Sequence, residues 1–288
     1  HAAFMPYRNA AAVKADAARW QKPWLDPVGA DWMSLNGTWK FNYVAKAADR
    51  PLDFFEDGYD VSEWDDIQVP GCIEMQGYDR PMYVNVEYAF HDNPPYTNIK
   101  VSEALTGPSP VGSYRRTFTL PEGWEARRTI LHFDGIYSGA YVWVNGKKVG
   151  YTQGGNMDAE FDVTQYVKAG ENNVSVEVFR WTDGSYLEGQ DMFHMSGIHR
   201  DVYLYSVPET YAFDHVIRAD YSQGYDNVRL SVTIAADGKD AAAKTFNVTV
   251  MAPDGSVVAS GEATYKAADS IVFEADIREP RMWSPEHP

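Results

Sequence analysis

A polar stretch at 180–201 holds most of the side chains in this sequence that could do chemistry. It follows an alternating apolar segment at 174–179 and precedes another at 202–205, so we expect a loop between two strands. Carboxylates, amides and hydroxyls lie there beside aromatic residues, and this mixture suits the hydroxyl groups and the apolar face of a neutral sugar. The residues leave open a structural alternative, in which the acids cap turns and pair with Arg180 and Arg200.

Three carboxylates of this stretch, Asp183, Glu188 and Asp191, are candidates for acid–base chemistry. The two carboxylates of a glycosidase must lie roughly 5–9 Å apart across a sugar cleft, and three acids in one loop do not establish that arrangement. His194 and His199 have a poor spacing for a metal pair on one helix face. The sequence has no Gly-rich phosphate loop, no His-Glu-x-x-His and no Cys-x-x-Cys. The residues alone therefore indicate a β protein whose polar, aromatic loops could bind a neutral sugar.

Composition limits the class of protein further. With 288 residues, of which 44% are hydrophobic, the chain is long enough for two domains with packed cores. Its formal charge of −16 and its lack of a basic run argue against nucleic acid or an anionic membrane as partner. The single cysteine, Cys72, excludes an internal disulfide framework and leaves a periplasmic or a cytoplasmic location open. Because the chain starts at His1, we expect that an N-terminal segment with any targeting signal has been removed.

Alternating apolar residues predict a dense series of strands between residues 32 and 207. The predicted strands are 35–44, 66–70, 112–120, 129–133, 141–151 with a hairpin turn at Asn145-Gly146, 160–163, 174–179 and 202–205. Residues 71–110, which include Pro81, Pro94 and Pro95, are predicted to form a long ordered loop. Many short strands with one long loop indicate a β-sandwich or jelly roll, whose loops gather at its ends.

A second β region follows a linker at 208–210. Five strands are predicted at 213–220, 227–234, 245–251, 257–261 and 270–277. An immunoglobulin-like sandwich needs about seven strands in roughly 100 residues, so 208–288 is predicted to be such a domain cut short. The missing strands would leave an exposed edge or apolar face. Residues 1–31 are predicted to form an arm that lies over a later domain, with a short helix at 10–20.

Many blocks of this sequence occur in the same order in a known family. They are 35–41, 69–70, 77–78, 81–86, 93–95, 133–138, 143–151, 160–162, 169–172, 180–188, 190–191, 196–198 and 200–202. Through them the chain resembles the N-terminal part of a glycoside hydrolase family 2 β-galactosidase of the large type. The resemblance implies a jelly-roll sugar-binding domain at 32–207, then the truncated immunoglobulin-like domain at 208–288. The (β/α)₈ barrel that carries both catalytic glutamates in that family is absent from the chain.

The resemblance implies a function and two site residues. The chain would be the non-catalytic region of a retaining enzyme that hydrolyses terminal β-D-galactosides. Asn85 matches the residue that reaches into the galactose subsite of the barrel, and Asp191 matches the acid that helps hold the sugar and ligates a sodium ion. Magnesium would bind on the barrel. The expected partners are a β-galactoside, the enzyme's own barrel and, in the intact enzyme, further copies of the chain.

Some parts of this sequence limit the resemblance. Phe193-His194 departs from the Trp-Arg that the family more often has, so the exact glycoside stays open. Asp183, Glu188 and Arg200 lie in the shared blocks without an assigned role. In the chain by itself we expect no hydrolysis, no ordered ion and at best millimolar affinity for sugar. We also expect Asn85 and Asp191 to lie at the same end of the jelly roll.

Two other functions are open at this point. One is a stand-alone carbohydrate-binding or adhesion module, which would need a complete second domain and an exposed aromatic platform. The other is a purely structural surface for assembly, which could coexist with the role in a β-galactosidase.

Overall fold

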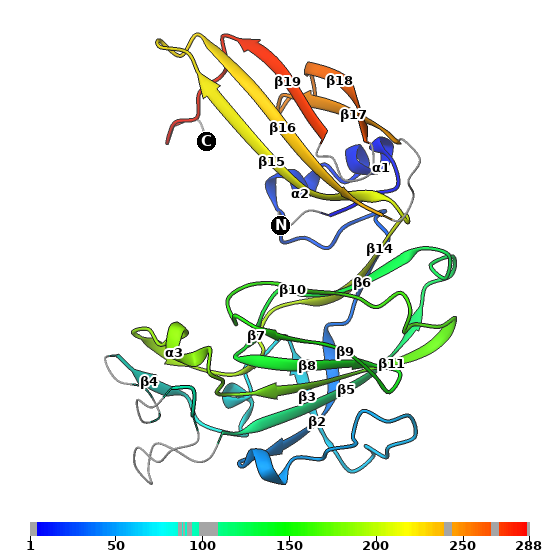
Figure 1. The fold of residues 1–288 in the computed structure, drawn as a ribbon, viewed down its shortest axis with the longest axis vertical. Helices are drawn as coiled ribbons and strands as arrows, with labels where there is room; N and C mark the ends of the chain where they lie inside the picture. Colours follow the sequence, from blue (N-terminus) through cyan, green and yellow to red (C-terminus); the bar gives the residue numbers. More distant parts are fainter. Residues whose placement is uncertain are drawn as a thin grey trace. The chain divides into compact units, whose positions relative to one another are not determined.

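The structure, a computed structural model, describes residues 5–85, 88, 90, 94–97, 109–238, 244–265 and 271–286. Within them the chain is nearly all β, as predicted. It forms two compact units, one of residues 6–206 and one built mainly from Val207 onwards (Figure 1). Each unit is described by itself below. No helix in the described part of the chain is long and apolar enough to cross a membrane.

The first unit contains a six-stranded and a four-stranded sheet. The larger sheet has the order β3-β2-β5-β11-β8-β9, and the smaller has the order β1-β14-β6-β10. The larger sheet comprises β3 (Asp65–Val69), β2 (Gly37–Val44), β5 (Val111–Leu120), β11 (Gly170–Phe179), β8 (Gly139–Val144) and β9 (Lys147–Gln153). The smaller sheet comprises β1 (Trp32–Ser34), β14 (Val202–Val207), β6 (Arg128–Phe133) and β10 (Ala159–Asp162). Each strand predicted between 35 and 205 is confirmed, because its alternating apolar residues have one buried face to occupy.

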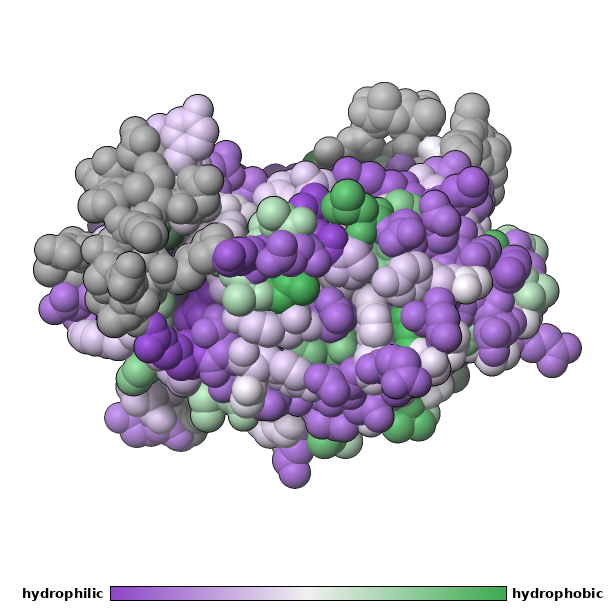
Figure 2. Space-filling view, turned by 90° about the horizontal axis from the view of Figure 1, so that it is seen from below, coloured by the Kyte–Doolittle hydropathy of each residue, from purple (hydrophilic) through white to green (hydrophobic). Residues whose placement is uncertain are grey.

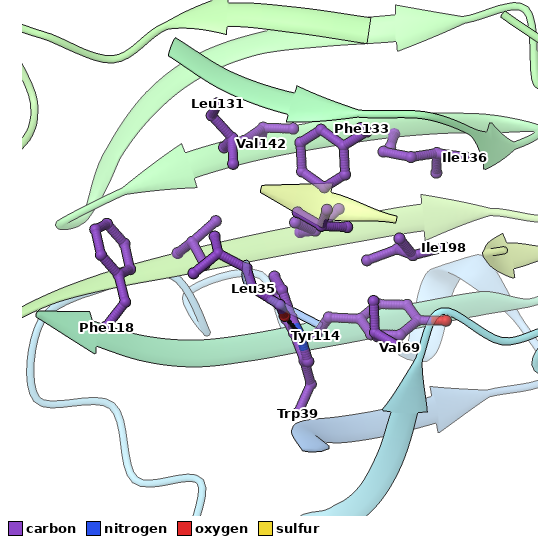
Figure 3. Packing of buried hydrophobic residues seen from close by; sticks show 14 of the residues in the cluster. Leu35, Trp39, Val69, Tyr114, Phe118, Leu131, Phe133, Ile136, Val142 and Ile198 are labelled. Carbon is purple, nitrogen blue, oxygen red and sulfur yellow. Dashed lines mark hydrogen bonds between the residues drawn. The ribbon is translucent and has the colours of Figure 1, made fainter. Parts of the chain in front are cut away.

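The core of this unit lies between the two sheets. Trp39 and Tyr114 extend into it from the larger sheet, and Leu131 and Phe133 extend into it from the smaller (Figure 3). These four side chains are at most 1% exposed. The turn between β8 and β9 has Asn145 at φ 48° and Gly146 at φ 73°. This left-handed pair is what a two-residue hairpin turn requires, so the Asn-Gly prediction is confirmed.

Two predicted loops contain short strands. The stretch 71–110 includes the 3₁₀ turn η2 (Glu74–Gln76) and the strand β4 (Met82–Val84), which begins directly after Pro81. The stretch 180–201 includes α3 (Ser185–Glu188), β12 (Met192–His194) and β13 (Gly197–Ile198), and β13 pairs with β7 (Ile136–Tyr137). These strands have only two or three residues, so their alternation is too short to recognise in the sequence.

The arm before β1 contains two short helices where one was predicted. They are α1 (Ala10–Ala15), whose N-cap is Asn9, and α2 (Ala18–Gln21). The 3₁₀ turn η1 (Ala47–Asp49) follows β2. The carboxylate of Asp31 pairs with Arg8 and lies 3.1 Å from Nη2 of Arg127. Because Arg127 comes directly before β6, this pairing anchors the arm to the sheets of the first unit.

The second unit has five strands in its described part, as predicted. A three-stranded sheet has the order β15 (Tyr211–Tyr221), β16 (Asn227–Asp237) and β19 (Ile271–Arg278). A separate hairpin pairs β17 (Lys244–Met251) with β18 (Val257–Tyr265). All these pairings are antiparallel.

Candidate functional site

The two residues expected to contact sugar lie next to each other on a two-stranded ribbon. Strands β4 and β12 pair antiparallel, with Met192 opposite Val84 at the end of the ladder. Asn85 follows Val84 and Asp191 precedes Met192, so the two residues occupy the next position of the same register. Residues that are more than a hundred positions apart are therefore neighbours at one end of this ribbon, as predicted.

The ribbon has one outward and one inward face. Tyr83 and Phe193 lie opposite each other in the ladder and so share a face, the Tyr83 hydroxyl contacts Asp191, and Asn85 lies one position beyond β4. All four are exposed, Tyr83 by 53% and Phe193 by 59%. The rings of Tyr83 and Phe193 lie 5.6 Å apart, tilted by 60°. An amide, a carboxylate and two aromatic rings thus form an outward surface, which we call the ribbon face.

The inward side of the ribbon packs on a small second core. Met82 from β4 is buried together with Phe90 and Trp181, and Tyr88 and Tyr186 pack against them. The rings of Phe90 and Trp181 lie 5.6 Å apart, edge to face. This aromatic packing holds the ribbon from beneath, so the ribbon face rests on an ordered support.

A buried ionic network lies behind the same ribbon. The guanidinium of Arg180 donates to Oδ2 of Asp79 at 2.5 Å and to the carbonyl oxygen of His194 at 2.9 Å. Its Nε lies 3.4 Å from a carboxylate oxygen of Glu74, and both side chains are almost fully buried. Glu74 also accepts hydrogen bonds from the amide and the hydroxyl of Ser196, at 2.8 and 2.6 Å. Arg180 is therefore a structural residue that joins η2, the start of β4 and β12.

Asp191 and Tyr83 form a hydrogen-bonded pair on the ribbon face. The Tyr83 hydroxyl donates to Oδ1 of Asp191. This bond to a carboxylate raises the pKa of Tyr83, because loss of the phenolic proton would place a second negative charge beside the first. The pair fixes one oxygen of Asp191, and no residue that the structure describes donates a hydrogen bond to Oδ2.

Asp183 and Glu188 have local structural roles. Oδ1 of Asp183 accepts the amide of Gly184 at 2.9 Å, at the start of α3. Oε1 of Glu188 accepts the amide of Gly155 at 2.8 Å. Burial raises the pKa of Glu188. These two acids therefore hold local backbone, as the structural alternative in the sequence analysis expected. The acids that pair with Arg180, Asp79 and Glu74, come from outside the 180–201 stretch.

The two histidines of this stretch are unsuited to a shared metal site. Burial lowers the pKa of His194 and of His199. His194 lies in β12 on the inward side of the ribbon, and its ring is 5.9 Å from that of Trp181. Among the residues that the structure describes, no group of three or more His, Cys, Asp or Glu could hold a metal ion. Arg200 donates two long hydrogen bonds, 3.5 and 3.4 Å, to the backbone carbonyl oxygens of Asp134 and Asn156.

Sequence reasoning missed the two aromatic residues of the ribbon face. Tyr83 and Phe193 each lie two residues from a predicted site residue, with an apolar residue between. That spacing is the signal of a shared strand face. The prolines around β4 and the glycines around β12 concealed it by favouring a loop at both places.

Comparison with known proteins gives a family and its relatives. The family profile described as "Glycosyl hydrolases family 2, sugar binding domain" matches residues 32–208. Among curated proteins, the β-galactosidase of Priestia megaterium is 36% identical over 302 residues, which cover all of this chain and 28% of the relative. The β-galactosidase of Photobacterium profundum is 38% identical, with 91% of this chain and 25% of the relative covered. The chain thus spans about a quarter of the length of these relatives.

Solved structures share the fold at lower identity. A β-glycosidase from Bacteroides vulgatus superposes with a TM-score of 0.67 at 22% identity, covering 89% of this chain and 30% of that one. A β-glucuronidase from Bacteroides uniformis also superposes with a TM-score of 0.67 at 22% identity, covering 89% of this chain and 29% of that one. At this identity the likeness establishes the fold.

Proposed function

The chain belongs to glycosyl hydrolases family 2 through that family's sugar-binding domain, and from this premise we propose that it is the non-catalytic region of a retaining β-galactosidase. Curated relatives at 33–38% identity bear the name β-galactosidase, which supports β-galactosides as the substrates. The β-glucuronidases among the structural relatives support only the fold. In this proposal the chain contributes sugar contacts to an active site whose catalytic groups lie on another domain.

The ribbon face is the observation that carries this proposal. Its amide can donate and accept hydrogen bonds with sugar hydroxyls, its carboxylate can accept them, and its rings can cover the apolar face of a pyranose. The face is outward and its side chains are exposed, so it would contact a sugar from one side only. A strong sugar site encloses most of its ligand, hence a second surface must complete this one.

Within this proposal Asn85 and Asp191 have distinct roles. Asn85 would hydrogen-bond a galactose hydroxyl through its amide. Asp191 would accept a second sugar hydroxyl through Oδ2, since Oδ1 already accepts from Tyr83. A carboxylate oxygen also suits a hard cation, so Asp191 would supply one ligand of the sodium ion. The other ligands would come from outside the ribbon face, because Asp191 is its one acid.

Hydrolysis would require two carboxylates on opposite sides of the glycosidic bond. Asp183 and Glu188 each accept a nearby backbone amide, so in this proposal neither serves as the acid or the nucleophile. The acid and the nucleophile would therefore come from the barrel, together with its magnesium. The chain by itself would orient sugar without cleaving it.

Hydrolysis of a chromogenic β-galactoside tests whether catalysis depends on a domain outside this chain. The 288-residue chain is assayed beside the longer product obtained by extending the coding sequence past Pro288. We expect turnover by the longer product and none by the chain alone. Activity that copurifies with the short chain would contradict the proposal.

The ribbon face is tested separately in the longer product. Asn85→Ala should raise KM for the galactoside and leave kcat nearly unchanged, because a contact made equally to the bound sugar and to the transition state affects only KM. Asn9→Ala, which changes an exposed helix-capping amide in the arm, is the matched control and should leave both constants unchanged. Equal kinetics for the two variants would remove Asn85 from the site.

A further inference from the structure

A second candidate site lies on the outer face of the six-stranded sheet. The valines of β11 and β8 are buried between the two sheets, so the residues that alternate with them point to the opposite face. Among these are Glu177 on β11, and Tyr141 and Trp143 on β8. Glu177 lies opposite Tyr141 in the ladder, and Trp143 lies opposite Lys148 of β9. Four large side chains from three adjacent strands therefore lie on one face.

The segment that follows η1 covers part of this face. The ring of Phe55 stacks on that of Trp143, with centroids 4.9 Å apart and planes 1° apart. Nε of Arg50 lies 3.0 Å from Oε1 of Glu177. Residues of the segment and of the three strands line a cavity of about 250 Å³, which we call the outer cavity. Its lining also includes Leu52, Tyr141 and Lys148. Because side chains from both walls contact each other, they converge on one space.

The charges around the outer cavity nearly cancel. The side chain of Glu177 is only 7% exposed and pairs with Arg50. The ammonium of Lys148 lies 4.0 Å from the centroid of the Tyr141 ring, a cation–π contact, and its side chain is exposed to solvent. A cationic ligand would meet Arg50 and Lys148. An anionic ligand would meet Glu177, which already neutralises Arg50, and would gain only a screened attraction to Lys148. The lining therefore favours a ligand without charge.

The same lining offers the contacts that a neutral sugar requires. Nη1 of Arg50 donates to the carbonyl oxygen of Ala47 at 2.7 Å, which holds the guanidinium beside Glu177. No residue that the structure describes donates a hydrogen bond to Oε2 of Glu177. This carboxylate acceptor and the ammonium donor on the same face suit the hydroxyls of a sugar. The rings of Phe55 and Tyr141 provide apolar contacts for its C–H groups.

We propose that the outer cavity is a second sugar site, which binds one neutral pyranose ring through the carboxylate of Glu177 and the rings of Phe55 and Tyr141. Its volume is slightly below the range for drug-sized ligands, about 300–1,000 Å³, so it would hold a single ring. The affinity would be on the order of millimolar, because Leu52 and Lys148 at its edge are exposed to solvent. The outer cavity shares no residue with the ribbon face, so sugar binding there would not depend on the proposed function.

An NMR titration of the 288-residue chain with methyl β-D-galactoside tests the site. We expect the amide signals of Leu52, Phe55, Tyr141 and Lys148 to shift together as the sugar is added. Glycerol is the control probe, since it has hydroxyls but no pyranose ring, and it should leave these signals in place. Two results overturn the proposal: no shift of these signals at the highest soluble concentration of the galactoside, or equal shifts with glycerol.

Three variants locate the bound sugar. Glu177→Gln should weaken binding of the galactoside roughly tenfold, because it replaces a charged acceptor. Leu52→Ala should weaken it about threefold through lost apolar contact. Since Leu52 is 69% exposed, this second variant should keep its fold. Leu25→Ala makes the same change at an exposed leucine of the arm and should have no effect. If Leu52→Ala and Leu25→Ala bind the sugar equally, the sugar does not lie in the outer cavity.

Hydrolysis by the longer product separates the two sugar sites. Leu52→Ala should leave KM and kcat for a chromogenic galactoside unchanged, whereas Asn85→Ala should raise KM. A rise in KM with Leu52→Ala would overturn the independence of the outer cavity. Unchanged kinetics with Asn85→Ala would count against the ribbon face alone.

Discussion

The two units of this chain differ in how much apolar surface they bury. In the first unit one continuous cluster of buried side chains reaches through both sheets. In the described residues from β15 onwards, the buried hydrophobic residues are Val228, Val232, Ile271 and Phe273. Since burial of apolar area is the main favourable term in folding, the second unit obtains much less stability from its own core.

The edge strand of the second unit shows the difference most clearly. Val216 and Ile217 are neighbours on β15, so their side chains point to opposite faces, yet they are 48% and 59% exposed. On β19 the pattern is the usual one, with Ile271 and Phe273 buried and Val272 exposed. A strand that is apolar on both exposed faces and lies at a sheet edge is a surface for pairing with further chain. In the described part of the chain, β15 thus exposes Val216 and Ile217 at the edge of its sheet.

Matched phenylalanines give the largest test of this comparison. Phe133→Ala should lower the free energy of unfolding of the first unit by about 4 kcal/mol, because the fully buried ring leaves a cavity between two sheets. Phe273→Ala should cost the second unit roughly 2 kcal/mol, since that ring packs in a thinner core. Guanidinium unfolding, with hydrogen exchange to separate the two units, measures both losses. Equal losses would show that the two cores are equally well packed.

Matched ion pairs sharpen the comparison at a smaller scale. Glu74→Gln leaves the buried Arg180 with one carboxylate fewer and should cost about 3 kcal/mol. Glu274→Gln breaks the exposed pair with Arg229 on the second unit's sheet, 2.9 Å in length, and should change stability by less than the experimental error. Thermal unfolding of the two variants measures the contrast. If Glu74→Gln is harmless, the network behind the ribbon face is not what holds η2, β4 and β12 together.

The fold could be predicted from the sequence wherever a strand has one buried face. Strands β2, β5 and β11 alternate over eight or ten residues, so their period is unmistakable. Strands β4 and β12 have three residues each, and their pairing joins segments that are a hundred residues apart. Nothing local reports such a pairing, because its stability comes from the aromatic side chains packed beneath it.

The candidate site also contains residues that the sequence predicts and residues that it does not. Asn85 and Asp191 could be named from the family resemblance, and their place at one end follows from the register of the ribbon. Their roles toward sugar and sodium stay predictions. Tyr83 and Phe193 could not be named, since an exposed aromatic residue becomes informative only when the strand that orients it is known.

The stability of the first unit should depend on pH through one buried histidine, His132. Burial opposes the charge on His132, but hydrogen bonds from its ring to Asp134 and Glu160, 2.8 and 2.7 Å, outweigh it and raise its pKa to about 9. The pKa in the folded state thus exceeds the ordinary histidine value of 6.5, which applies to the unfolded chain. The charged ring therefore contributes fully below about pH 6.5, and the contribution disappears as the pH rises toward 9.

The expected loss in that window is about 2 kcal/mol, after allowance for partial screening by solvent. Chemical unfolding of the first unit at pH 6 and pH 9.5 measures it, with His132→Gln as the comparison. The variant should be less stable at pH 6 and should lose little stability as the pH rises. A wild-type stability that stays constant between these pH values would mean that the ring is neutral in the folded state.

The smallest expected change in folding stability is for a substitution on the ribbon face, because its side chains are exposed. Asp191→Asn removes a surface charge and should change the stability of the fold by no more than about 0.5 kcal/mol. It also removes the carboxylate that raises the pKa of Tyr83, so that pKa should fall toward the ordinary value of 10.0. Carbon-13 labelling of tyrosine, followed by NMR titration, measures the fall.

In the longer product, Asp191→Asn should raise KM for the galactoside and weaken the dependence of KM on sodium. A variant with an altered Tyr83 pKa but unchanged kinetics would leave the Tyr83–Asp191 pair as a surface contact, and the sugar-binding role would then have to lie elsewhere on the ribbon face.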